Sequence, residues 1–109
     1  MDFLSTGPAS SRTLRNQVRK YDNIRRISDL TVTDIVVEDG KAVGAVALHL
    51  ESGEPVTIAA KATIIATGGL TSMYNRNSAS ANMGGDGFAL GLRAGAELID
   101  MEFVQFFPI

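Results

Sequence analysis

Two runs of β-branched residues joined by Asp39-Gly40 limit the fold of this chain more than any other feature. The first run covers residues 30–37 and the second covers residues 42–50. An Asp-Gly pair between such runs is a strong hairpin signal, because a tight hairpin turn needs residues with positive φ. A third short run follows after another polar turn. The sequence therefore predicts a three-stranded antiparallel β-meander over residues 30–60.

The segments outside the meander predict an α/β fold. Leu14 and Val18 lie four positions apart and form a thin apolar stripe, which is typical of a helix that covers another surface. Residues 62–67 form a nearly continuous apolar run, which is typical of a strand covered on both faces, as in a parallel sheet. The predicted elements around the meander are a helix 8–21, a sheet strand 62–67, a loop 70–83, a helix 86–95 and an extended segment 97–109.

Composition excludes several functional classes. The 109 residues carry a net charge of −2, so no basic footprint suggests nucleic acid. The chain has no cysteine, and its one histidine, His49, cannot form a metal site with scattered carboxylates. No signal peptide is recognisable, and no apolar run approaches the roughly 18 residues of a membrane span. We therefore expect a cytoplasmic setting with no metal.

Glycines follow the predicted strand and open the predicted helix. Thr67-Gly68-Gly69 ends the apolar run, and Gly85-Asp86-Gly87 begins the next helical segment. Ligands of doubly wound folds bind at the carboxyl ends of the strands, and bare backbone allows a close approach there. The acid in the second motif has two interpretations, a helix cap or an acceptor for ribose hydroxyls.

The helix 86–95 carries glycines at positions 87, 91 and 95, a spacing of four that predicts one bare face. Each interior glycine costs about 0.5–1 kcal/mol relative to alanine, so another backbone or a ligand is expected against that face. The chain contains no Gly-x-Gly-x-x-Gly turn and no Walker loop, so it does not itself encode a pyrophosphate-binding fingerprint.

Four stretches, taken in order after the meander, resemble the flavoprotein subunits of fumarate reductase and succinate dehydrogenase, a family that includes L-aspartate oxidase. They are Ala62 to Gly69 (ATIIATGG), Gly85-Asp86-Gly87, Leu92 to Gly95 (LRAG) and Asp100 to Phe106 (DMEFVQF). The resemblance spans nearly the whole chain. It implies part of a Rossmann-type FAD-binding domain in which FAD lies extended and a capping domain closes over the flavin.

The resemblance also implies cofactor-binding positions. The segment after the strand would lie near the flavin, the acid would contact FAD, and two residues of the first meander strand would contact the adenine through backbone atoms. These positions are Thr31, Val32, Thr67, Gly68, Gly69 and Asp86.

One departure concerns the substrate. Phe107 stands where the family has a histidine that binds the substrate carboxylate, so a relative with another substrate becomes an alternative. No catalytic residue is assigned, because the family's proton-donating arginine matches no position here. We expect a middle section of a longer flavoprotein, inactive by itself, which transfers hydride between flavin and a carboxylate-bearing substrate.

The implied partners are the remainder of the flavoprotein, a dicarboxylate-like small molecule and an electron-transfer subunit such as an iron–sulfur protein. Such a subunit would place the protein at the membrane periphery. The alternative of another class is a non-enzymatic β-rich interaction module whose functional surface is the meander.

Overall fold

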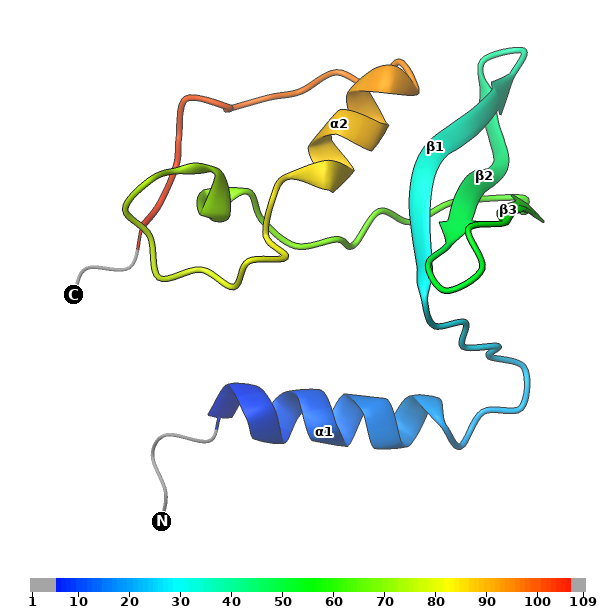
Figure 1. The fold of residues 1–109 in the computed structure, drawn as a ribbon, viewed down its shortest axis with the longest axis horizontal. Helices are drawn as coiled ribbons and strands as arrows, with labels where there is room; N and C mark the ends of the chain where they lie inside the picture. Colours follow the sequence, from blue (N-terminus) through cyan, green and yellow to red (C-terminus); the bar gives the residue numbers. More distant parts are fainter. Residues whose placement is uncertain (1–5, 107–109) are drawn as a thin grey trace.

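The structure, a computed structural model, describes residues 6–106. Figure 1 shows α2 beside β1, whereas α1 lies apart from the sheet. The elements in chain order are α1 (Thr6–Val18), β1 (Leu30–Glu38), β2 (Lys41–His49), β3 (Pro55–Ala59), the 3₁₀ turn η1 (Thr71–Met73) and α2 (Asp86–Arg93).

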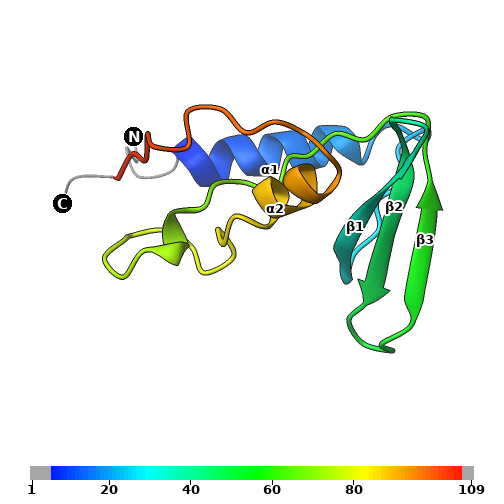
Figure 2. The same cartoon turned by 90° about the horizontal axis from the view of Figure 1, so that it is seen from above.

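The three strands form one antiparallel sheet in the order β1-β2-β3. Figure 2 shows them side by side at one end of the molecule. The hairpin between β1 and β2 turns at Asp39 and Gly40, whose φ angles are 48° and 74°. Two successive positive φ angles match the twist of a tight hairpin, which is why an Asp-Gly pair suits this position. The predicted β-meander is confirmed.

The sheet is interrupted by two bulges that the sequence did not predict. The register passes from Val32↔Ala47 to Asp34↔Val46, which leaves Thr33 as an extra residue on β1. A second shift follows between Val36 and Val37. Bulges of this kind bend a strand and re-aim its side chains, and they occur often next to binding sites.

The segment 62–67 differs from its prediction as a sheet strand covered on both faces. It runs past the meander without a strand partner among residues 6–106, and the Ile64 side chain is 91% exposed. A parallel strand takes its hydrogen bonds from neighbouring parallel strands, and the meander offers none. Its place in a larger sheet stays a prediction.

Element ends also differ from the predicted ones. Helix α1 ends at Val18, and the residues after it form a turn in which Lys20 N donates to Gln17 O at 2.9 Å. The C-terminal segment is not uniformly extended, because Asp100 has a φ of 57° and its carbonyl accepts a hydrogen bond from Phe103 N.

Two apolar side chains stand out as buried among residues 6–106, one on the sheet and one on α2. Ala47 on β2 is 1% exposed and Leu90 on α2 is 5% exposed. Within the described part of the chain, α2 contacts the sheet through β1, and α1 buries none of its residues. Helix α2 therefore packs against both β1 and the segment 62–67.

Candidate functional site

The start of helix α2 places Asp86 without using it as a cap. Gly85 is the N-cap residue, with a left-handed φ of 83°, and Asp86 is the first helical residue. Of the two interpretations of Asp86, the structure therefore does not support the N-cap. The exposed carboxylate forms no hydrogen bond to the part of the chain that the structure describes. A negative charge at this end still interacts favourably with the helix dipole, and its acceptor atoms remain open to a ligand.

Strand β1 and helix α2 enclose a cavity of about 520 Å³, which we call the β1–α2 cavity. Four of the predicted cofactor-binding residues line it together: Thr31, Val32, Thr67 and Asp86. Its remaining walls come from the same two elements, namely Leu30, Thr33, Ala89, Leu90 and Arg93. Residues from three distant parts of the sequence thus converge on one space.

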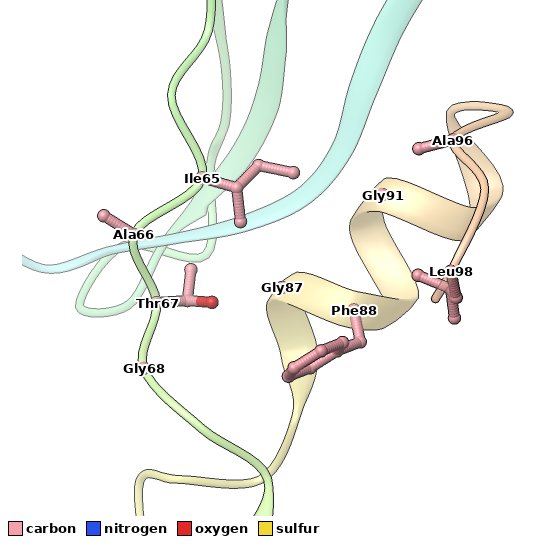
Figure 3. A pocket seen from close by; sticks show the side chains of 9 residues that line it. All are labelled: Ile65, Ala66, Thr67, Gly68, Gly87, Phe88, Gly91, Ala96 and Leu98. Carbon is pink, nitrogen blue, oxygen red and sulfur yellow. The ribbon is translucent and has the colours of Figure 1, made fainter. Parts of the chain in front are cut away.

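A second cavity of about 340 Å³, the glycine cavity, is also lined by Thr67. Figure 3 shows the side chains around it, which are mostly apolar. Its lining residues are Ile65, Ala66, Thr67, Gly68, Gly87, Phe88, Gly91, Ala96 and Leu98. Gly68 has a φ of 85°, and a Cβ added to it would meet no atom within 4 Å. Its backbone is therefore freely accessible to a ligand.

Gly69 lies outside both cavities as they are lined here. A Cβ added to Gly69 would lie 3.1 Å from Cε of Met83, so this glycine accommodates the loop 70–83 and not an open space. Phe107, which stands at the family's histidine position, is outside the described residues.

The bare face predicted for α2 is only partly bare. Side chains of Ile65 and Thr67 point at the helix (Figure 3), and a Cβ added to Gly87 would collide with Thr67 Oγ1 and lie 2.9 Å from Ile65 Cγ2. A side chain therefore occupies the space for which a backbone or ligand was expected. Gly95 serves another purpose, because its φ of 88° ends the helix.

Arg93 joins α2 to β1 and was not assigned a role from the sequence. Its Nε donates to Asp34 Oδ1 at 3.2 Å, and its Nη2 donates to the carbonyl of Thr33 at 2.6 Å. Both side chains of the ion pair are more than half exposed, and such pairs contribute about 0–1 kcal/mol. One signal was present: two polar residues in succession, Thr33 and Asp34, break the alternation of the strand, as a bulge does.

The β1–α2 cavity carries opposite charges at its two ends. Asp86 and Arg93 are the first and last residues of α2, about 10 Å apart along the helix axis. Apolar walls with a few convergent polar groups are typical of small-molecule sites. A carboxylate at one end and exposed strand backbone at the side suit a ligand with hydroxyl groups and a flat ring.

Potential metal ligands are scattered over the described residues. No group of three His, Asp or Glu side chains gathers among residues 6–106. The Nδ1 atom of His49 lies 3.2 Å from Ser52 Oγ, in the turn after β2. Over the same range, no helix has the length and hydropathy that crossing a membrane would require.

Comparison with known proteins gives the family. The family described as "FAD binding domain" matches residues 2–109. The chain is 42% identical over 103 residues to one of the subunits of the fumarate reductase (CoM/CoB) of Methanothermobacter marburgensis, a match that covers 94% of this chain and 19% of that protein. It is 42% identical to the fumarate reductase flavoprotein subunit of Proteus vulgaris and 38% identical to that of Escherichia coli, with 94% of this chain and 17% of each relative covered.

The chain thus spans less than a fifth of the length of these curated relatives. No solved structure gave a significant match. The resemblance seen in the sequence is confirmed: the chain belongs to the FAD-binding domain family, with fumarate reductase flavoprotein subunits among its relatives and FAD as its cofactor.

Proposed function

We propose that these residues form part of the FAD site of a flavin-dependent oxidoreductase of the fumarate reductase type. The observation that carries this proposal is the convergence of Thr31, Val32, Thr67 and Asp86 on the β1–α2 cavity. The names of the relatives support the reaction class. A Rossmann-type arrangement, with 62–67 as a strand of its main sheet, is part of the same proposal.

The residues present fit an extended dinucleotide. The Asp86 carboxylate would accept a hydrogen bond from a ribose hydroxyl, and the backbone of Thr31 and Val32 would contact the adenine edge. Gly68, at the glycine cavity, would allow the flavin to lie against its backbone. Thr67 lines both cavities, so we propose that one elongated ligand runs past this residue and reaches both.

The bound flavin would supply hydride transfer to or from a carboxylate-bearing substrate. The residues of this chain supply binding and orientation, as proteins do around redox cofactors. We propose that the substrate resembles a dicarboxylate, that an iron–sulfur or other electron-transfer subunit is the partner, and that the segment alone has no activity. A non-enzymatic β-rich module is less well supported, because the start of β1 lines a cavity together with α2.

The test is FAD binding to the complete protein with Asp86→Asn. This change removes the charge and keeps the shape, so the dissociation constant for FAD should rise by about tenfold, the scale of one charge-assisted hydrogen bond. The matched control is Asp39→Asn, because Asp39 is also an exposed acid and asparagine tolerates its positive φ. Flavin fluorescence during titration of the apoprotein measures both.

The control should bind FAD as the unchanged protein does. If Asp86→Asn and Asp39→Asn bound FAD with equal affinity, Asp86 would not be an FAD-binding residue. If the unchanged protein bound no FAD, the proposal as a whole would be refuted.

A further inference from the structure

The bulge in β1 falls at Thr33, beside the point where helix α2 approaches the strand. Thr33 has no register partner on β2, because the pairing passes from Val32 directly to Asp34. Its side chain donates back to the sheet, with Oγ1 3.3 Å from the carbonyl of Val46. The Thr33 carbonyl accepts a hydrogen bond from another element, beside the β1–α2 cavity that Thr33 lines.

Arg93 meets this carbonyl from a position 60 residues later in the chain. The same guanidinium donates to Asp34, the next residue of the strand, so one side chain holds two consecutive residues of the bulge. The planar guanidinium presents its donors in a fixed fork, which an ammonium group cannot reproduce. Arg93 thereby fixes α2 against β1 at a defined distance and angle.

The place of the two Arg93 hydrogen bonds, which we call the Arg93 clamp, matters more than the free energy of folding that they contribute. Arg93 and Asp34 are 53% and 58% exposed, and an ion pair in such contact with water stabilises a fold little. Yet the clamp joins the two elements that carry the proposed cofactor contacts, with Thr31 and Val32 on one side and Asp86 on the other. Because Arg93 joins α2 to β1, a change at Arg93 would alter the distance between Asp86 and the backbone of Thr31 and Val32.

We propose that Arg93 is a positioning residue, which, with the bulge at Thr33, sets the width of the β1–α2 cavity for the adenosine half of FAD. This inference rests on the proposed function. It assigns to Arg93 no contact with the reacting atoms and no direct contact with the flavin ring. Its effect passes through the placement of Asp86 relative to β1.

The experiment titrates apoprotein of the complete protein with FAD, ADP and FMN, which separates the adenylate half of the cofactor from the flavin half. For Arg93→Gln, the dissociation constants for FAD and ADP should rise by up to about tenfold, the full effect of losing the proposed hydrogen bond from the ribose to a displaced Asp86, while that for FMN stays unchanged. Arg93→Lys keeps the charge but loses the fork, so it should behave nearly as Arg93→Gln does.

Two further variants sharpen the test. Asp34→Asn removes the ion pair and leaves the Thr33 carbonyl bound, so it should raise the ADP constant less than Arg93→Gln does. Arg76→Gln is the control, because Arg76 is an exposed arginine of the loop 70–83 that lines neither cavity. It should leave all three constants unchanged.

The outcomes separate this inference from the proposed function. Loss of ADP and FMN affinity in equal measure in Arg93→Gln would show a merely structural role and overturn the inference, as would no change in either. If the unchanged protein bound no FAD at all, the proposed function itself would fail. A selective loss of ADP and FAD affinity supports both.

Discussion

Gly68 differs from the turn glycines because its backbone borders a cavity. Its φ is 85°, and the turn residue Gly53 has a φ of 70°, with open space around both. Alanine in the left-handed region costs about 1–2 kcal/mol wherever it stands. The two glycines therefore carry the same backbone requirement in different surroundings, since only Gly68 lines the glycine cavity.

Gly68→Ala and Gly53→Ala should therefore lower the free energy of unfolding by similar amounts, about 1–2 kcal/mol each. Only Gly68→Ala should also weaken FAD binding, because its methyl group enters the space where the flavin is proposed to lie. Chemical denaturation and FAD titration of the complete protein measure the two effects. Equal FAD affinities in both variants would argue against a flavin beside Gly68.

At the residue scale, the candidate cofactor-binding positions follow from the family resemblance and not from residue spacing alone. Asp86 lies at a helix start, as the sequence predicts, but the N-cap, one of its two predicted roles, belongs to Gly85. Arg93 had no predicted role, because its partners, the Thr33 carbonyl and the Asp34 carboxylate, lie at a bulge in a distant strand. A bulge depends on pairing with another strand, so a local pattern only hints at it.

At the scale of elements, α2 and the segment 62–67 approach each other through small residues. A Cβ at Gly87 would collide with Thr67, whereas a Cβ at Gly91 would find ordinary contacts at 3.8 Å to Ile65 and Ala96. Two glycines of the same helix, one turn apart, are therefore not equivalent. Only the first is required by the packing.

Gly87→Ala should destabilise the complete protein by about 1–3 kcal/mol, the usual effect of overpacking. Gly91→Ala should be neutral or should stabilise it by up to about 1 kcal/mol, because alanine favours the helix. Thermal denaturation compares the two variants. The packing would be contradicted by a Gly87→Ala protein as stable as Gly91→Ala.

An element could be predicted from the sequence where its hydrogen-bond partners are close in the sequence. The meander could be predicted because its turns and alternating runs are local and its strands pair with their neighbours in sequence. The segment 62–67 could not be verified in the same way, because a parallel strand pairs with strands that are distant in the sequence. Helix α2 ends at Arg93, and Gly95 follows with a positive φ. The sequence itself contains this glycine as a signal for the end of a helix.

At the scale of the whole molecule, the segment leaves an unusually large surface exposed. Its accessible surface is 9498 Å², whereas a compact monomer of 11.6 kDa exposes about 5,800 Å². Its radius of gyration is 16.6 Å, against about 13 Å for a compact domain of this length. Large apolar side chains are correspondingly uncovered, including Ile64, Ile99 and Phe103.

The isolated 109-residue chain should therefore show no sharp thermal transition, because burial of apolar surface supplies most of the stability of a domain. Near-UV circular dichroism and calorimetry should reveal little fixed tertiary structure, and FAD should not be retained on desalting. A cooperative transition of the isolated chain would instead favour the self-sufficient β-rich module.

The central claim, that β1 and α2 hold the cofactor between them, is tested most directly by a crystal structure of the complete protein with FAD bound. We predict that the adenosine half lies in the β1–α2 cavity, with the Asp86 carboxylate within about 2.5–3.0 Å of a ribose hydroxyl. FAD bound elsewhere, with Asp86 facing solvent and that cavity filled by protein side chains, would contradict the account.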